Sequence, residues 1–153
     1  MIDNTIPICY RLKTNDDLPF IYASWLSSIR SNTSAYLSPQ ALYTSEQTKK
    51  INHILSISNT FIAYLDPLPD ETQTLLGYAA YQYLNDHLLI HFSFVKSPFR
   101  SFNILSNILD LINIPKLPII LTYPPDPKLL KQLNQNHNII YDHFYYERSF
   151  YVK

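Results

Sequence analysis

The sequence predicts one α+β domain, built on a central mixed and mostly antiparallel sheet flanked by helices. Three observations support this fold class. The chain has 153 residues, a length typical of one domain. Residues 6–12 alternate apolar and polar side chains, as a half-buried strand does. Residues 18–29 carry apolar side chains at steps of three and four, the pattern of an amphipathic helix. No internal repeat interrupts the chain, so we expect a single domain over residues 1–153.

The N-terminal third predicts a strand followed by two helices. After the strand at residues 6–12, the polar residues 14–17 cap a helix that runs to about Arg30. Beyond a polar loop, Ser38 and Pro39 open a second helical stretch that ends before Asn59. Its polar middle, residues 44–50, leaves open whether the helix is broken there.

The middle of the chain predicts a three-stranded antiparallel meander. Its strands are residues 61–65, 75–84 and 87–95. The proline-containing segment 66–70 and the dipeptide Asn85-Asp86 supply the two turns between them.

The rest of the chain predicts two more helices and three more strands. Helical spacing returns at residues 102–112, and the short apolar run 119–121 is typical of a strand inside a sheet. A short helix follows at residues 128–135. Strands at residues 139–145 and 149–152 then form a closing hairpin.

Composition excludes several classes of protein. Twelve basic residues balance twelve acidic ones, which argues against a nucleic-acid binder that works by electrostatic attraction. A content of 46% hydrophobic residues excludes a disordered chain. The lone Cys9 can form neither an internal disulfide nor a thiolate metal cluster. The N-terminus has no secretory pattern, and no apolar run approaches the ~20 residues that span a bilayer. We therefore expect a soluble, intracellular protein.

Glycine is nearly absent from the sequence. Average usage predicts roughly eleven glycines in a chain of this length, but there is only Gly77, beside eleven prolines. A phosphate-binding loop, which usually relies on glycine, must be built here from other residues.

The order of elements resembles the fold of the GCN5-related N-acetyltransferases (GNAT). Residues 17–30, with the core Ile-Tyr-Ala-Ser-Trp-Leu-Ser-Ser and a following Arg, resemble the first helix of bacteriophage-encoded GNAT-like proteins. Residues 76–78 and 90–100 resemble the third and fourth strands of the family and the turn into its cofactor helix. The resemblance covers most of the chain and is specific through residue 100.

The turn after the fourth predicted strand is a candidate anion site. A strand that ends at Val95 and a helix that begins near Ser101 direct free amides and the positive end of a helix dipole at one point. The resemblance implies that this anion is the pyrophosphate of coenzyme A, with the pantetheine arm along the strand. The cofactor contacts that it implies are Phe94, Val95, Arg100, Ser101, Phe102, Asn103, Ile104 and Leu105.

The loop departs from the family motif at the positions that usually hold small residues. Arg100 matches the leading Arg, but Ser101, Asn103 and Leu105 stand where the motif has glycine or another small residue. Asn tolerates left-handed backbone geometry, so Asn103 can preserve the turn. Leu105 either occupies the space that phosphate oxygens need or belongs to the core with Ile108. We therefore expect a degenerate cofactor loop.

Catalytic candidates are few. The resemblance implies a strand-borne Glu or a water chain as the base, and a Tyr in the penultimate helix as the acid. Residues 126–135 contain no Tyr, so Tyr123 and His91 are the nearest substitutes, and a purely structural role stays open for both. We expect no metal site, because no His or Cys set has ligand spacing except His87 and His91, four apart on a strand.

The C-terminal residues 141–151 are rich in Tyr and Phe. Part of this aromatic surface fits a buried sheet, and part suits an interface, since Tyr is favoured at protein contacts. We expect a protein partner or a homo-oligomer that docks through this hairpin, with no nucleic acid and no membrane span.

Two functions remain open. The first is a phage or prophage GNAT-fold protein with a degenerate acyl-CoA site, which acts through protein contacts in the host cytoplasm or the virion and needs no cofactor. The alternative is an acetyl-CoA-dependent N-acyltransferase that moves an acetyl group to a primary amine.

Overall fold

The computed structural model describes residues 7–32, 40–65, 73–114, 116–123, 127–142 and 144–145. Its elements are β1 (Ile8–Leu12), η1 (Asn15–Asp17), α1 (Leu18–Asn32), α2 (Gln40–Ile57), β2 (Asn59–Leu65), β3 (Thr74–Tyr83), β4 (Leu88–Val95), η3 (Ser97–Phe102), α3 (Ile104–Ile112), β5 (Ile119–Leu121), α4 (Pro127–Leu133) and β6 (Ile139–Tyr141). The short helices η1 and η3 are 3₁₀ helices.

The six strands form one mixed sheet in which each strand lies beside its neighbours in the sequence, in the order β1-β2-β3-β4-β5-β6. The pairs β1–β2, β2–β3 and β3–β4 are antiparallel, which confirms the predicted meander. The pairs β4–β5 and β5–β6 are parallel, and helices α3 and α4 provide the crossovers between their strands. The predicted mixed, mostly antiparallel sheet is confirmed.

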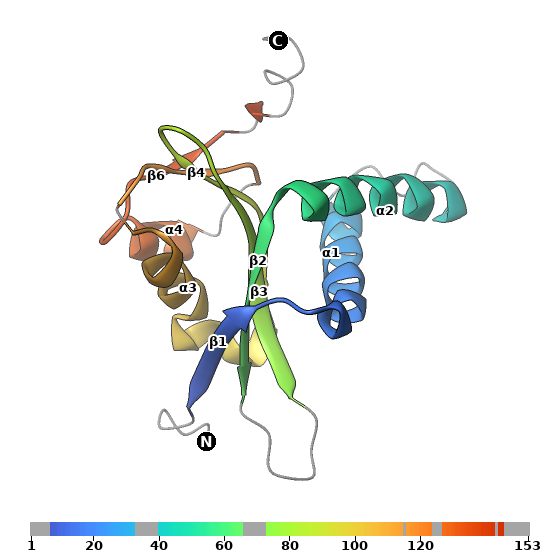
Figure 1. Ribbon diagram of the computed structural model, residues 1–153, viewed down its shortest axis with the longest axis horizontal. Coiled ribbons are helices and arrows are strands. Elements are labelled where there is room, and N and C mark those ends of the chain that lie inside the picture. Colours follow the sequence, from blue (N-terminus) through green and yellow to red (C-terminus); the bar gives the residue numbers. More distant parts are fainter. Residues whose placement is uncertain are drawn as a thin grey trace.

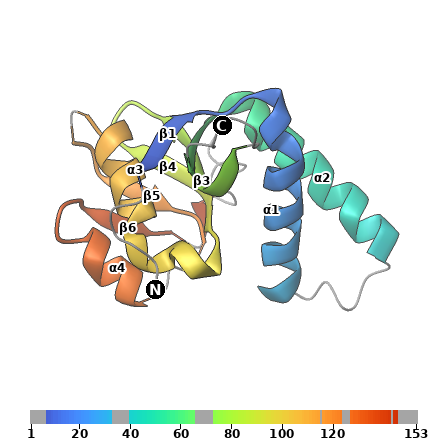
Figure 2. The same ribbon diagram turned by 90° about the horizontal axis from the view of Figure 1, so that it is seen from below.

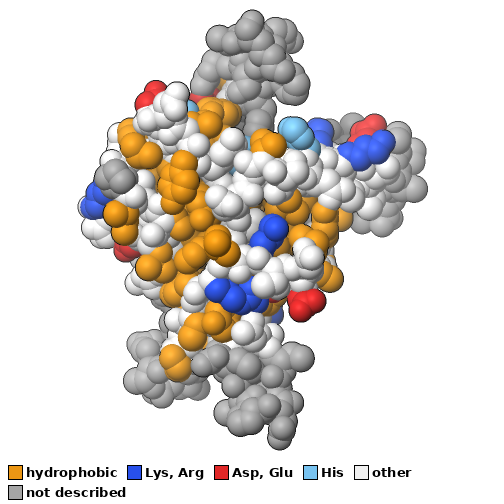
Figure 3. All heavy atoms as spheres, in the orientation of Figure 1, with side chains coloured by type: hydrophobic (Ala, Val, Ile, Leu, Met, Phe, Trp, Pro, Cys, Tyr) orange, Lys and Arg blue, Asp and Glu red, His pale blue; other side chains and the backbone are white. Residues whose placement is uncertain are grey.

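Two pairs of helices cover the two faces of the sheet, α1 and α2 on one side and α3 and α4 on the other (Figures 1 and 2). The larger core lies under α3 and α4, and its fully buried members include Ile90 and Ile108. The second core lies under α1 and α2 and contains Trp25, Ile51 and Tyr78. Charged side chains are few and scattered over the face seen in Figure 3, where hydrophobic side chains occupy much of the surface. Burial of apolar surface on both sides of the sheet is therefore the main source of stability.

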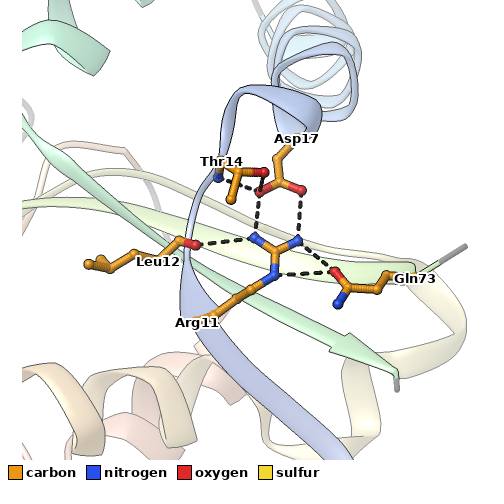
Figure 4. A network of polar contacts seen from close by, with 5 residues as sticks. All are labelled: Arg11, Leu12, Thr14, Asp17 and Gln73. Atoms are coloured by element: carbon orange, nitrogen blue, oxygen red, sulfur yellow. Dashed lines mark hydrogen bonds and ion pairs between the residues drawn. The ribbon is translucent and has the colours of Figure 1, made fainter. Parts of the chain in front are cut away.

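A polar network fixes the junction between β1 and α1 (Figure 4). The guanidinium of Arg11 donates two hydrogen bonds to the carboxylate of Asp17, at 2.7 and 2.9 Å. Asp17 also accepts from the backbone N–H of Thr14 at 2.8 Å, and Arg11 lies over the ring of Tyr64, 5.1 Å from its centroid. Burial alone would raise the pKa of Asp17, but the bonds from Arg11 and Thr14 outweigh it and hold that pKa below its usual value.

Several predicted boundaries are wrong by a few residues. The second helix is continuous over Gln40–Ile57, because its polar residues Thr44, Ser45 and Glu46 face solvent and leave the internal hydrogen bonds of the helix intact. The helix predicted at residues 102–112 begins at Ile104, after the 3₁₀ turn Ser97–Phe102.

The C-terminal part of the chain also differs from the prediction. The helix predicted at residues 128–135 covers Pro127–Leu133, and the strand predicted at residues 139–145 ends at Tyr141. The predicted strand 149–152 lies outside the described residues, so the closing hairpin is untested. Among the helices that the structure describes, none is both long enough and apolar enough to cross a membrane.

Candidate active site

The candidate site is a gap between the ends of β4 and β5. These strands pair only over Leu88–Ile90 of β4, opposite Ile119–Leu121. Strand β4 continues for five more residues, from His91 to Val95, and the last four of them, Phe92–Val95, pair with β3 on one side. On the other side, the described part of the chain places no strand against them. This stretch of β4 therefore presents one row of its backbone N–H and C=O groups to the gap.

A bulge at His91 accompanies this divergence. Ala80 pairs with Phe92 and Tyr81 pairs with Ile90, so His91 is an extra residue in β4. A bulge bends its strand and increases the local twist. It also changes which side chains face which helices: Ile90 packs in the core under α3 and α4, whereas Phe92 packs in the core under α1 and α2.

Two side chains that follow β5 reach across the gap to β4. The hydroxyl of Thr122 donates a hydrogen bond to the carbonyl of His91, at 3.1 Å. The hydroxyls of Tyr123 and Ser93 share a hydrogen bond. The ring of Tyr123 also lies 5.9 Å from that of Phe92, centroid to centroid. Side chains thus join the two segments where the backbone pairing has ended.

The loop after β4 brings Arg100 and the start of α3 to the open end of the gap. The Nε of Arg100 donates to the carbonyl of Val95 at 3.0 Å, and the Arg100 side chain is exposed. Asn103 precedes α3 with φ 57° and ψ 31°, the left-handed conformation. Its carbonyl accepts the first α-helical bond, from the N–H of Asn107 at 2.9 Å. Its side-chain oxygen accepts a hydrogen bond from Gln132 of α4. The expectation that Asn103 preserves the turn is confirmed.

The predicted cofactor residues fall into three groups. Arg100 and Asn103 lie at the surface of the loop. Ile104 and Leu105 are 1% and 5% exposed and belong to the core under α3 and α4, so of the two interpretations of Leu105 the core is correct. The side chains of these two residues are therefore closed to a ligand.

The remaining predicted cofactor residues lie in β4 and η3. Phe94 is partly buried beside α1, with its ring 6.0 Å from that of Phe20, and Val95 packs toward α3. Ser101 and Phe102 belong to η3, but their side chains lie outside what the structure describes. That any of these residues contacts a cofactor stays a prediction.

His91 is buried on the side of the sheet that α1 and α2 cover. Its exposed fraction is 6%, and its Nε2 hydrogen bonds to Oε1 of Gln82 at 3.0 Å. Burial, and secondarily the charge of His53, lowers the pKa of His91 to about 4. The imidazole is therefore neutral at physiological pH.

Tyr123 lies on the other side of the gap, against the core under α3 and α4. Burial raises its pKa to about 12, although the hydrogen bond with Ser93 acts in the opposite direction. The phenol thus keeps its proton at physiological pH. The side chain of His91 bonds to Gln82, whereas that of Tyr123 bonds to Ser93.

Sequence reasoning missed Ser93, Thr122 and Gln82. Ser93 is a polar residue between two phenylalanines in a strand, and Thr122 directly follows the buried strand β5. Neither residue indicates its partner in the sequence, and Ser93 itself pairs regularly with Ala79 of β3. Among the described residues, no group of three or more His, Cys, Asp or Glu side chains is placed to hold a metal ion. Instead, His87 bonds to Asp86 at 2.6 Å and to Tyr145 at 3.0 Å.

Comparison with solved structures shows which fold this is. The chain is similar to a possible acetyltransferase from Clostridium difficile 630, with a TM-score of 0.57 and 17% identity over 88% of this chain and 91% of that one. It is also similar to an N-acetyltransferase from Staphylococcus aureus Mu50, with a TM-score of 0.50 and 17% identity over 84% and 81% of the two chains. The sequence matches no protein-family model and no curated protein. At these identities the similarity shows the fold alone, and it confirms the GNAT-like α+β fold that the resemblance implied.

Proposed function

We propose that this protein is an acetyl-CoA-dependent N-acyltransferase that moves an acetyl group to a primary amine. The observation that carries the proposal is the edge of β4 from Phe92 to Val95, beside which the described part of the chain places no strand and which opens toward the start of α3. An extended ligand with amide groups can pair with such an edge as another strand would. The pantetheine arm of coenzyme A is a ligand of this kind.

The loop after β4 suits the diphosphate of the cofactor. The first amides of a helix have no partner within it and carry partial positive charge, which favours an anion at the start of α3. Arg100 uses its Nε to hold the carbonyl of Val95, and its guanidinium has further N–H donors for phosphate oxygens. Asn103 adopts the left-handed conformation that glycine would otherwise supply. The lack of glycine in this loop is therefore compatible with cofactor binding.

Tyr123 is the proposed acid. In the transfer, the amine nitrogen attacks the thioester carbonyl and gives up one proton to solvent water, the carbon–sulfur bond breaks, and the departing thiolate takes up a proton. A phenol that is still protonated at physiological pH and sits at the edge of the gap is suited to donate that proton. His91 is not suited to be the base, since a group with a pKa near 4 removes a proton poorly at neutral pH. We assign it a structural role beside Gln82.

The other interpretation, a phage protein that acts through contacts, rests on the departures of the cofactor loop from the family motif and on the Tyr- and Phe-rich residues near the C-terminus. Ile140, Tyr141 and Phe144 are 45%, 38% and 54% exposed, which is compatible with a protein partner or a second copy at this edge of the sheet. The similar structures are acetyltransferases and favour the enzyme. The phage resemblance, the degenerate site and the partner stay predictions.

Calorimetric titration with acetyl-CoA and with CoA tests the proposal. We expect the wild-type protein to bind in the micromolar range. Arg100→Ala should weaken binding about tenfold or more, because a hydrogen bond to a charged group contributes roughly 1.5–3 kcal/mol.

Lys49→Ala is the matched control, since it removes an exposed positive charge on α2, on the opposite face of the sheet. It should leave the affinity unchanged. Absence of binding at millimolar cofactor would show that the proposed function is wrong.

A further inference from the structure

The gap between β4 and β5 is crossed by two hydrogen bonds of different character. The bond from Thr122 goes to the backbone carbonyl of His91, the residue directly after Ile90, at which the pairing of β4 with β5 ends. His91 is the buried residue at the bulge, and Thr122 supplies a hydrogen-bond donor to its carbonyl. Breaking the bond removes that donor, which is unfavourable for a buried group. We therefore expect the bond from Thr122 to stay closed and to hold the end of β5 against β4.

The bond between Tyr123 and Ser93 lies further along the gap, toward Val95 and the cofactor loop. It joins two hydroxyls, each of which can donate and accept. This bond can open at the cost of one hydrogen bond between neutral groups, while Thr122 keeps the β5 segment attached to β4.

The position of this bond conflicts with that of an extended ligand. A pantetheine arm that pairs with the free edge of β4 has to pass Ser93, the middle residue of the stretch from His91 to Val95. The phenol of Tyr123 reaches from the β5 side to that same residue. The arm and the bond compete for the space between the two segments.

We propose that the Ser93–Tyr123 hydrogen bond is a latch that closes the gap in the ligand-free protein, and that acyl-CoA enters by displacing it. This inference rests on the proposed function. Opening the latch also releases the phenol that is the proposed acid, so the same hydroxyl becomes available to the thioester sulfur when the cofactor is in place. Ser93 is then a positioning residue that holds Tyr123 until the ligand arrives.

Ser93→Ala tests the latch. It removes the Ser93 hydroxyl and leaves Tyr123 in place. The ligand then no longer has to break this hydrogen bond when it enters the gap. We expect acetyl-CoA to bind about fivefold more tightly, as a net hydrogen bond of about 1 kcal/mol predicts. In the ligand-free protein, the amides of residues 92–95 should exchange with solvent faster than in the wild type.

Ser24→Ala is the matched control. Ser24 also shares a hydrogen bond with a tyrosine hydroxyl, that of Tyr78 at 2.8 Å, but in the core under α1 and α2. This variant should change neither the affinity for acetyl-CoA nor the exchange of residues 92–95. Tyr123→Phe should share the gain in affinity and lose kcat, because it removes the latch and the acid together.

The outcomes separate the latch from the function. If the wild-type protein binds acetyl-CoA and Ser93→Ala changes neither affinity nor exchange, the latch does not exist and the proposed function stands. If no variant binds acetyl-CoA, the proposed function is wrong and the latch has no role in it.

Discussion

Leu105 has a different role in the structure from the one that its place in the loop suggests. At 5% exposure it packs among the core residues under α3 and α4. The neighbouring Asn103 keeps the turn with φ 57°. The two departures from the family motif thus have separate explanations, one in packing and the other in backbone conformation.

Leu105→Ala should therefore destabilise the protein and should not improve cofactor binding. Removing a buried leucine side chain costs about 2–4 kcal/mol, because a cavity remains. Leu111→Ala on the same helix should cost much less, since Leu111 is 50% exposed. Urea denaturation of both variants, with an acetyl-CoA titration, checks this. A tighter complex of Leu105→Ala at unchanged stability would show that Leu105 blocks the site instead.

His91 should make the stability of the protein depend on pH. Its pKa is about 4 in the folded chain, against 6.5 for an unperturbed histidine. Between these values the unfolded chain binds the proton more readily, so this contribution is complete above pH 6.5 and is lost as the pH falls toward 4. We expect a loss of about 2 kcal/mol between about pH 7 and about pH 5.

His91→Gln should lack this part of the pH dependence, because glutamine does not titrate. Urea denaturation of the wild-type protein and of the variant at both pH values measures the difference. An equal loss of stability in the two proteins would mean that His91 is not held neutral by burial.

At the scale of elements, β4 connects the fold to the site, and Gly77 controls how closely β3 approaches it. Gly77 pairs with Val95, the last residue of β4. A Cβ at position 77 would lie 2.5 Å from the carbonyl oxygen of Phe94 and 3.1 Å from the Cα of Val95. The one glycine of the chain lies outside the cofactor loop, but it sets the position of the strand end from which that loop starts.

Gly77→Ala should therefore affect both stability and binding. The contact with Phe94 is to the backbone, so β4 has to shift, and forced overpacking of this kind typically costs about 1–3 kcal/mol. Because the shift moves Val95 and with it the carbonyl that holds Arg100, acetyl-CoA should bind more weakly. Denaturation and titration of this variant measure the two effects. Unchanged stability would show that the two strands separate without strain.

The strands and helices themselves could largely be predicted, because each depends on a local pattern. The alternation around Tyr10 and the helical spacing around Trp25 gave the correct element types. The bulge at His91 could not be predicted, since it depends on how β4 pairs with β3. The 3₁₀ turn before Asn103 was also missed, and the contact of the Asn103 side chain with Gln132, 29 positions away, has no local signal in the sequence.

At the scale of the molecule, the site arises where the two halves of the sheet meet. The antiparallel meander ends in β4, the parallel strand β5 joins it over only three residue pairs, and the gap opens beyond them. The strand, loop and helix that border the gap could be predicted from the sequence around Arg100. The contacts across it could not, because Thr122 and Tyr123 meet residues of β4 that lie 31 and 30 positions earlier in the chain.

A crystal structure of the protein with acetyl-CoA tests the central claim most directly. The account predicts that the pantetheine arm lies along residues 92–95 of β4, that the diphosphate contacts Arg100 and the backbone at the start of α3, and that Tyr123 has left Ser93. A cofactor bound elsewhere, or an empty gap at saturating acetyl-CoA, would contradict it.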